Sequence, residues 1–268
     1  MKTLFFLYLT MILQEKRIHV KDFRQPVHSK IYIKIYSAVD SPEIASIYEQ
    51  EHKKVLGAFG VDDIHVCQSY AWLQNPETYL IVAETKSGEL VGGVALVKTS
   101  SDSQLPMMKA VQKLCPEFNE FVRSTSTLGI AEVAGFWVTK SAKGQDVSKA
   151  LLTALVSVST KLNIPYQVAF VNQYASTIAQ EFGFMKMEAF GKNGTFAYPN
   201  ETYQSSLILL DAQLLISTHP LVRKRAMTIR KKLQHTYTNE RGVVYSYDLR
   251  SLLEKTKGAT VLENVRQN

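Results

Sequence analysis

The feature that most constrains the fold is a strand, a loop, a helix and a second strand in direct succession. Ile130–Val138 is an apolar strand pattern, and Gln167–Val171 is a second pattern that is typical of a buried strand. Between them, apolar residues recur every three or four positions over Asp146–Leu162, which indicates a helix. Strands joined through a helix run parallel in one sheet. We therefore predict that Ile130–Val171 forms a parallel strand pair with a connecting helix.

The remaining patterns place further strands before and after this unit. Tyr79–Glu84 and Glu89–Lys98 flank the short turn Lys86-Ser87-Gly88, which predicts an antiparallel hairpin. Other segments predict strands at Ile31–Ser37, Met185–Phe190 and Ser205–Leu210, and helices at Ser41–Ala58, at Leu105–Val122 with a break near Pro116, and at Gln173–Phe182 ending at Gly183. This order indicates an α/β fold class, with an α+β mixed central sheet flanked by helices.

Composition and cysteine usage are those of an ordinary globular protein. The 268 residues are 46% hydrophobic and 21% charged, which allows a sizeable core without covalent crosslinks. The expected organisation is an N-terminal extension at 1–30, a main domain at 31–211 and a basic helical C-terminal extension at 212–268. Cys67 and Cys115 have no metal or disulfide spacing, which favours a reducing, cytoplasmic compartment and predicts no metal cofactor.

The segment Leu4–Leu13 is almost entirely apolar and leaves three interpretations open. It resembles the hydrophobic region of a signal peptide, but no small-residue cleavage site follows it. It is also too short to cross a bilayer, which needs roughly 20 apolar residues. We expect this segment either to dock on the domain as a helix or strand, or to contact a membrane surface loosely. The third interpretation is that translation starts at Met11.

The positive charge of the chain is concentrated near its C-terminus. No acidic residue lies between Asp211 and Glu240. Six basic residues in this interval supply most of the net charge of +7: Arg223, Lys224, Arg225, Arg230, Lys231 and Lys232. His219–His235 is expected to be an amphipathic helix, whose basic segment 223–232 is a solvated face or binds an acidic carrier protein, an anionic membrane surface or nucleic acid. Nucleic acid is the weakest of these, because no DNA-binding motif accompanies the segment.

The connection that follows Ile130–Val138 has the features of an anion site. The polar loop Thr139–Gln145 leads into a helix start, where backbone N–H groups point outward. Gly135 within the strand indicates a bulge or the close approach of a ligand. Pyrophosphate is the usual guest of such a site in a mixed α/β sheet. The alternative is an ordinary strand–loop–helix connection that binds nothing.

Two segments, Val138–Leu152 and Asn172–Phe184, resemble the GNAT superfamily of acyltransferases, as does the order of elements. In that family a strand ending in valine is followed by Q/R-x-x-G-x-G/A, which cradles the coenzyme A pyrophosphate, and then by a helix that begins with a Leu-Leu pair. Leu151-Leu152 sets the register in this chain. The residues at the motif positions are then Lys143, Asp146 and Ser148, and a later N-x-x-A segment ending in G-F is matched by Asn172, Ala175, Gly183 and Phe184. The resemblance also implies that the two parallel strands splay apart at the loop.

This sequence departs from the GNAT pattern at two positions. Asp146 stands where a glycine normally lets phosphate approach, and its carboxylate should repel phosphate unless it points away as the helix N-cap. Lys143 and Lys149 supply compensating positive charge. Many members of the family have a tyrosine at the position of Ala179, where it protonates the leaving thiolate. The thiolate would therefore leave unassisted here or use another proton donor.

A narrower resemblance concerns the strand Glu132–Val138. It is similar to the E-x-x-R-x-x-V pattern of the autoinducer synthases and long-chain N-acyl amino acid synthases. Glu132 and Val138 match the pattern, whereas Gly135 replaces the arginine. This resemblance implies a long acyl group and an amino acid or a similar acceptor, and the missing arginine weakens the expectation of a carboxylated acceptor.

The GNAT resemblance implies an N-acyltransferase that moves an acyl group from a CoA or acyl-carrier-protein (ACP) thioester to a small-molecule amine, with acyl-CoA or acyl-ACP as co-substrate. Glu132 is the candidate catalytic base, because a carboxylate within an apolar strand is otherwise costly. The alternative is that Glu132 faces solvent. The candidate donor-binding residues are Gly135, Phe136, Val138, Lys143, Gly144, Gln145, Ser148 and Asn172.

Two other functions remain open from the sequence. One is a catalytically silent GNAT-like domain that binds an acyl ligand or a protein partner, which Asp146 and Ala179 favour. The other is a membrane-surface scaffold that uses Leu4–Leu13 and the basic helix. His52 and His65 are weaker catalytic candidates, because a single histidine is more often structural.

Overall fold

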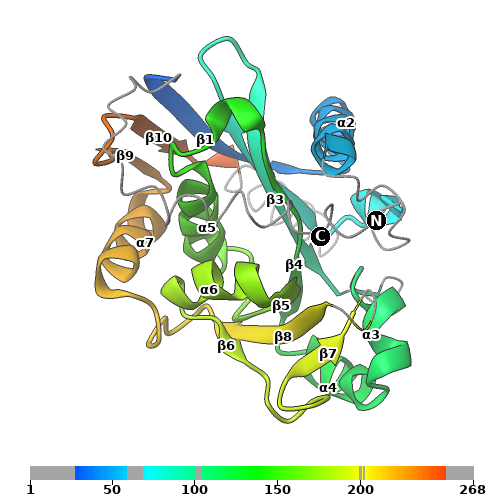
Figure 1. Cartoon of the computed structure of the whole chain (residues 1–268). Helices are drawn as coiled ribbons and strands as arrows, with labels where there is room; N and C mark the ends of the chain where they lie inside the picture. Colours follow the sequence, from blue (N-terminus) through cyan, green and yellow to red (C-terminus); the bar gives the residue numbers. More distant parts are fainter. Residues whose placement is uncertain (1–27, 59–68, 100–103, 199–200, 202, 252–268) are drawn as a thin grey trace, which may run out of the picture.

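One mixed sheet organises the computed structural model, which describes residues 28–58, 69–99, 104–198, 201 and 203–251. Nine of the ten strands within these residues follow the order β6-β8-β5-β4-β3-β2-β1-β10-β9, and the tenth, β7, pairs with β8 (Figure 1). The strands are β1 (Lys30–Ser37), β2 (Thr78–Glu84), β3 (Leu90–Lys98), β4 (Ile130–Val138), β5 (Tyr166–Asn172), β6 (Met185–Lys186), β7 (Thr195–Ala197), β8 (Gln204–Asp211), β9 (Gln234–Thr238) and β10 (Val244–Asp248). The helices are α2 (Pro42–Ala58), α3 (Met108–Leu114), α4 (Glu117–Ser126), α5 (Val147–Val158), α6 (Gln173–Glu181) and α7 (Pro220–Lys232), with short 3-10 turns η1 (Ala71–Gln74) and η2 (Lys140–Ala142).

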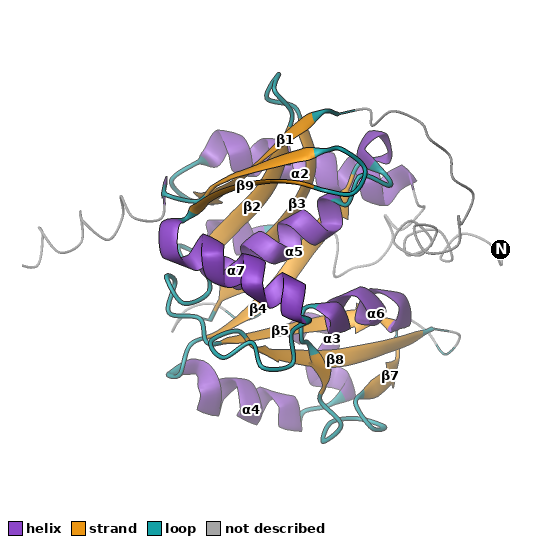
Figure 2. Ribbon diagram, turned by 90° about the vertical axis from the view of Figure 1, so that its left-hand side faces the viewer, coloured by secondary structure: helices purple, strands orange, loops and turns teal. Residues whose placement is uncertain are grey.

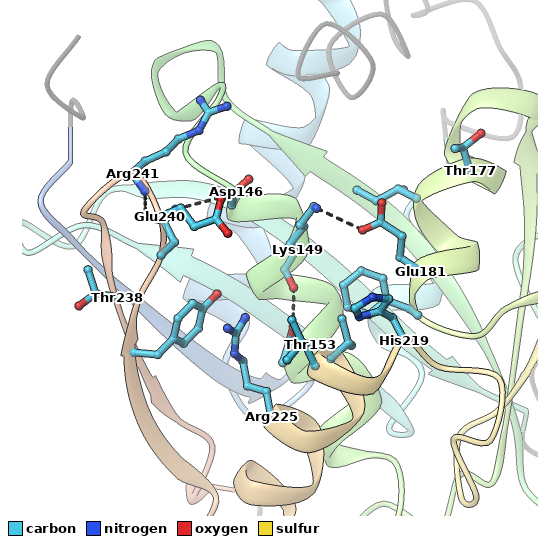
Figure 3. Close-up of a pocket in the computed structure, with 16 residues that line it drawn as sticks. Asp146, Lys149, Thr153, Thr177, Glu181, His219, Arg225, Thr238, Glu240 and Arg241 are labelled. Carbon is cyan, nitrogen blue, oxygen red and sulfur yellow. Dashed lines mark hydrogen bonds and ion pairs between the residues drawn. The ribbon is translucent and has the colours of Figure 1, made fainter. Parts of the chain in front are cut away.

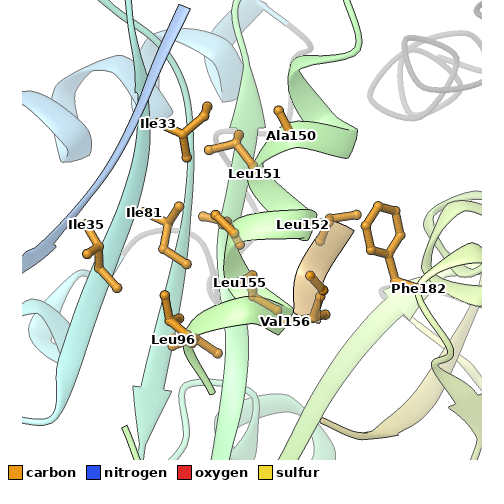
Figure 4. Close-up of a cluster of buried hydrophobic side chains, with 14 of the residues drawn as sticks. Ile33, Ile35, Ile81, Leu96, Ala150, Leu151, Leu152, Leu155, Val156 and Phe182 are labelled. Atoms are coloured by element: carbon orange, nitrogen blue, oxygen red, sulfur yellow. The ribbon is translucent and has the colours of Figure 1, made fainter. Parts of the chain in front are cut away.

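The helix α5 forms the centre of the core on one face of the sheet. Every residue from Val147 to Val158 except Lys149 is buried, because strands lie beneath the helix and α6 and α7 pack around it (Figures 1 and 2). Figure 4 shows Leu151 and Leu155 of α5 beside Ile81 of β2. A helix that is apolar on nearly all sides is stable only when it is enclosed in this way.

Three other helices pack against the opposite face. The helix α2 lies over β3 and β4, where Tyr48 packs with Val82 and Trp137 in a second apolar cluster. The helices α3 and α4 form a third cluster around Phe118, next to β4 and β8. Both faces of the sheet are thus covered, and the predicted mixed sheet flanked by helices is confirmed.

The strand–helix–strand unit has the predicted direction. The strands β4 and β5 pair in parallel, while β2 and β3 form the predicted antiparallel hairpin. The helix α6 ends at Gly183, as predicted: the φ angle of Gly183 is +90°, and the N–H of Phe184 donates to the carbonyl of Ala179 at 3.2 Å. This is the glycine-terminated helix end that left-handed backbone permits.

The strand predicted at Met185–Phe190 is wrong beyond Lys186. The chain turns already over 187–190, where the N–H of Phe190 donates to the carbonyl of Met187 at 3.1 Å, and Gly191, Asn193 and Gly194 then have positive φ angles of +57°, +51° and +74°. Such angles interrupt extended backbone. The turn leads into β7, a short strand that the sequence pattern did not predict.

The helical C-terminal extension was predicted incompletely. The helix α7 is present, but it ends at Leu233, whose φ angle of +52° turns the chain directly into β9. The strand β10 then pairs in parallel with β1, so residues 234–248 extend the main sheet. In these five-residue strands, polar residues and Val244 alternate with aromatic residues and histidine. Tyr245 and Tyr247 of β10 are buried on the α5 side. Their strand state depends on pairing with β1, more than 200 residues earlier.

The basic segment 223–232 is not one charged surface. Arg230 is buried and donates hydrogen bonds to the carbonyls of Val156 at 2.8 Å and Gln213 at 3.0 Å, and to that of Ala212. Arg225 lies over the ring of Tyr237, 3.6 Å from its centroid. The exposed members are Arg223, Lys224, Lys231 and Lys232.

Some predictions concern residues outside the described ranges, namely the apolar segment Leu4–Leu13, Cys67 and His65. Cys115 is a buried free thiol. In the part of the chain that the structure describes, no helix is long and apolar enough to span a membrane.

Candidate active site

The strands β4 and β5 separate partway along their length. They are paired from Ile130 to Glu132 on β4 and from Tyr166 to Val168 on β5, and no pairing between them follows within the described residues. Both strands nevertheless continue, β4 to Val138 and β5 to Asn172. This is the splay expected at the loop. Gly135–Val138 lies beyond the last β4–β5 pair, and this stretch is half-buried apart from Trp137.

A β-bulge lies in the opened part of β4. Gly93 pairs with Trp137 and Ala95 with Ala134, so that Gly135 and Phe136 together stand opposite the single residue between Gly93 and Ala95. Gly135 has a φ angle of +55°, which favours glycine. The bulge turns the carbonyl of Gly135 toward α2, where it accepts a hydrogen bond from the Tyr48 hydroxyl.

The arginine of the E-x-x-R-x-x-V pattern has no room at position 135. A Cβ atom there would lie 2.9 Å from the Tyr48 hydroxyl oxygen and 3.2 Å from Cη2 of Trp72. These two rings belong to an aromatic cluster that also contains His52. Burial lowers the pKa of His52 to about 4, and its Nδ1 lies 2.8 Å from the Tyr70 hydroxyl. A buried, neutral histidine with this contact has a structural role in the aromatic cluster.

Glu132 is buried where β4 still pairs with β5. Its side chain is 6% exposed, so it is not a solvent-facing strand residue. Its neighbours Ala131 and Val133 pack into the α5-side cluster, which puts Glu132 on the opposite face. There the N–H of Met107 donates to Oε2 of Glu132 at 2.6 Å. Burial raises the pKa of Glu132 to about 8, and the Met107 hydrogen bond offsets part of this rise.

The loop at the start of α5 keeps the backbone shape of a glycine-containing loop. Gly144 has a φ angle of +75°, and Asp146 has a φ angle of +65° in the left-handed region. Asp146 occupies the N-cap position, but its side chain makes no capping hydrogen bond to α5. Its Oδ2 instead accepts a hydrogen bond from Nδ2 of Asn239 at 3.0 Å. The carboxylate is thus directed to the β9–β10 hairpin, while Lys143 is exposed in the same loop.

Three other candidate residues have internal roles. Gln145 is buried, and its side chain accepts from the N–H of His28 at 3.0 Å and donates to the carbonyl of Ser141 at 2.9 Å. Ser148 is buried in the first turn of α5. Oδ1 of Asn172 accepts from the N–H of Ala175 at 3.2 Å, which caps the start of α6. Their contribution to a donor site would come from the backbone positions that they fix.

A cavity of about 630 Å³ lies beside this loop, between α5, α6, α7 and the β9–β10 hairpin (Figure 3). It is lined by cations and anions in equal number: Lys149, Arg225, Arg241, Asp146, Glu181 and Glu240. Nζ of Lys149 lies 3.1 Å from the Glu181 carboxylate. The hairpin residues of this wall were not predicted, because no sequence motif marks them.

Ala179 lies on α6, where the family resemblance places a tyrosine. It is 7% exposed and packs into the α5-side cluster, next to Phe182. A methyl group cannot protonate a thiolate. Within the described ranges, no group of three or more His, Cys, Asp or Glu side chains could hold a metal ion.

Comparisons with known proteins show a shared fold. No family model and no curated protein matches the chain. Among solved structures, the N-acyl amino acid synthase FeeM from uncultured soil microbes superposes with a TM-score of 0.53 at 15% identity, over 69% of this chain and 98% of FeeM. The CoA-dependent acyl-homoserine lactone synthases MesI and BjaI give TM-scores of 0.48 and 0.49, both at 15% identity over 74% of this chain, and over 95% and 90% of their own chains. The predicted fold class is confirmed by the fold shared with FeeM, and at this identity the likeness to FeeM concerns the fold alone.

Proposed function

We propose that the chain is an N-acyltransferase that moves an acyl group from a CoA or carrier-protein thioester to an amine. The observation that carries this proposal is the opening between the parallel strands β4 and β5, next to a bulge and a left-handed loop at a helix start. An extended thioester donor needs such a slot, with backbone groups along its length and an anion site at its end.

In this proposal the donor follows β4 toward the α5 loop. The pantetheine chain lies along the backbone of Gly135, Phe136 and Val138, beyond the last β4–β5 pair. The phosphate end lies at the loop Lys143–Ser148, where Gly144 and Asp146 have left-handed backbone and the first turn of α5 begins. Lys143 adds an exposed positive charge.

The chemical step is attack of the amine on the thioester carbonyl. The C–N bond forms, the oxyanion is stabilised by a backbone N–H of the bulge, and the C–S bond then breaks. The amine proton goes to the carboxylate of Glu132, directly or through water. The sulfur leaves as the thiolate, since Ala179 offers no proton. The raised pKa of Glu132 makes its carboxylate a stronger base than an exposed one.

The acceptor class follows from two features. FeeM is described as an N-acyl amino acid synthase, and its fold relationship to this chain supports an amino acid or a similar small amine as acceptor. The long acyl group is what the resemblance of Glu132–Val138 to the E-x-x-R-x-x-V pattern implies. Position 135 offers no cation for a carboxylate, because Tyr48 and Trp72 fill the space beside it. Recognition of an acceptor carboxylate would therefore use a residue other than the one at this position.

The exposed cations of α7 are a second element of the proposal. Arg223, Lys224, Lys231 and Lys232 remain available for an acidic carrier protein or an anionic membrane surface, whereas Arg225 and Arg230 are engaged within the protein. We place the reaction in the cytoplasm, which the cysteine pattern favours.

A catalytically silent acyl-binding domain is the second candidate. Two observations favour it: Ala179 lacks a proton donor, and Glu132 is enclosed next to Met107. Such a domain would bind a thioester in the same slot without turning it over.

The deciding experiment offers the purified protein acetyl-CoA, palmitoyl-CoA and palmitoyl-ACP, each with a mixture of the 20 amino acids and simple amines. Free thiol release and mass spectrometry of N-acyl products measure turnover, and calorimetry measures donor binding. A new N-acyl product supports the transferase. Donor binding without thiol release selects the silent domain, and no binding of any thioester contradicts both.

A further inference from the structure

The aspartate in the donor loop needs an explanation, because it combines two unfavourable features. Asp146 has left-handed backbone, which an L-residue other than glycine adopts at a cost. Its carboxylate also stands at the N-terminus of α5, where the proposed function places the donor phosphate. A carboxylate that is free to turn toward the first turn of α5 would repel that phosphate.

Asn239 holds this carboxylate away from the helix. Nδ2 of Asn239 donates to Oδ2 of Asp146 at 3.0 Å and to the carbonyl of Gln145 at 3.1 Å. Oδ1 of Asn239 accepts from the N–H of Arg241 at 3.0 Å and from that of Val243 at 2.9 Å. The oxygen of the Asn239 amide therefore closes the β9–β10 turn, and its nitrogen binds the loop before α5.

Two further hydrogen bonds join the hairpin to the same loop. The Tyr245 hydroxyl donates to the carbonyl of Gln145, and Arg241 donates to the carbonyl of Gly144. Three consecutive loop residues are thus bound by one hairpin. The hairpin is itself fixed, because β10 pairs in parallel with β1 of the main sheet.

We infer that the β9–β10 hairpin is the scaffold of the donor loop and that Asn239 is a positioning residue, which keeps the Asp146 carboxylate off the phosphate site. This inference rests on the proposed function. Asn239 acts through Asp146 and does not itself touch the reacting atoms.

The test uses the epistasis between these two residues in the full-length protein. Asn239→Ala keeps the net charge and frees the Asp146 carboxylate. The Kd of CoA and of palmitoyl-CoA, measured by calorimetry, should therefore rise about ten-fold. In turnover assays the donor KM should change more than kcat. Adding Asp146→Gly to Asn239→Ala should restore donor affinity to within about two-fold of the wild type. If Asn239 had only a structural role, removing the Asp146 carboxylate would not restore donor affinity.

The matched control is Gln234→Ala, which removes an exposed amide at the start of the same hairpin and should leave donor Kd unchanged. If Asn239→Ala does not fold, Asn239→Asp keeps the acceptor oxygens of the turn and opposes Asp146, and the same rescue by Asp146→Gly is expected. Unchanged donor affinity in Asn239→Ala, or no rescue in the double variant, overturns the inference. Absence of any donor binding by the wild type overturns the proposed function instead.

Discussion

The hydroxyl of Tyr48 on α2 donates a hydrogen bond to the backbone carbonyl of Gly135 at the bulge of β4. Tyr48 is fully buried, and its ring packs edge-on against Trp72 and Trp137. The hydroxyl is thus held by a rigid aromatic cluster and fixes the orientation of the Gly135 peptide. Because the proposed oxyanion donor is a backbone N–H of this bulge, Tyr48 connects the helix layer to the reaction centre.

Tyr48→Phe should reduce kcat about ten-fold while donor KM changes little, because the bulge loses one hydrogen bond and the donor loop is untouched. The free energy of unfolding should fall by about 1 kcal/mol. Thiol-release kinetics and urea unfolding measure the two effects. Tyr70→Phe, which removes the hydroxyl that contacts His52, is the control and should leave kcat unchanged. An unaltered kcat in Tyr48→Phe would show that the bulge does not depend on this contact.

Glu132→Gln should lower turnover by ~10²–10⁴-fold with nearly unchanged donor affinity, because the residue is assigned to proton transfer. In the wild type the carboxylate forms as pH rises through about 8, so kcat should increase from pH 6 to 9. The variant should lose this limb of the pH profile. Turnover within a few-fold of the wild type would remove Glu132 from the mechanism and favour the silent domain.

The same carboxyl should make stability depend on pH. In the folded protein Glu132 keeps its proton up to about pH 8, whereas the unfolded chain releases it near the ordinary value of 4.5. The contribution of Glu132 to stability is therefore largest below pH 4.5 and is lost between pH 4.5 and 8, by on the order of several kcal/mol. Urea unfolding at pH 5 and pH 8.5 measures this loss. The free energy of unfolding of Glu132→Gln should change less between these two pH values than that of the wild type. An equal change in both proteins would show that Glu132 is not buried in its protonated form.

Lys143→Glu should raise the Kd of CoA about ten-fold or more, since it replaces the exposed cation of the donor loop with an anion. Raising the salt concentration should reduce this difference, because the site is exposed. Asp146→Gly should bind donor equally well or better, as it keeps the left-handed backbone and removes the carboxylate. Lys161→Glu, an exposed lysine beyond the end of α5, is the charge-matched control for calorimetry.

Arg230→Met should lower the free energy of unfolding by about 2–4 kcal/mol, because the buried guanidinium satisfies the carbonyls of Val156, Ala212 and Gln213. Exposed Arg223→Met should change it by less than about 0.5 kcal/mol. Urea unfolding of both variants distinguishes a structural cation from a surface one. Equal stability of the two variants would mean that α7 docks without its buried arginine.

Local periodicity was enough to predict the centre of this fold. The strand Ile130–Val138, the apolar helix after it and the glycine-ended helix at Gly183 depend on side-chain spacing and backbone preference within a few residues. The same spacing failed after Lys186, where residues 187–190 form a turn closed by the N–H of Phe190 and the carbonyl of Met187. It also failed at β9 and β10, because five alternating residues become a strand only when a partner strand is present.

The sequence by itself determined the strand–loop–helix unit and the residue types of the candidate donor loop. Tertiary structure alone decided that the Asp146 carboxylate faces Asn239, that Tyr48 holds Gly135, and that Glu132 is enclosed beside Met107. These contacts join residues 25 to 93 positions apart. Helix and strand propensities are local, whereas burial and hydrogen-bond partners, which set the pKa of a carboxylate and the direction of its charge, arise only when distant segments pack together.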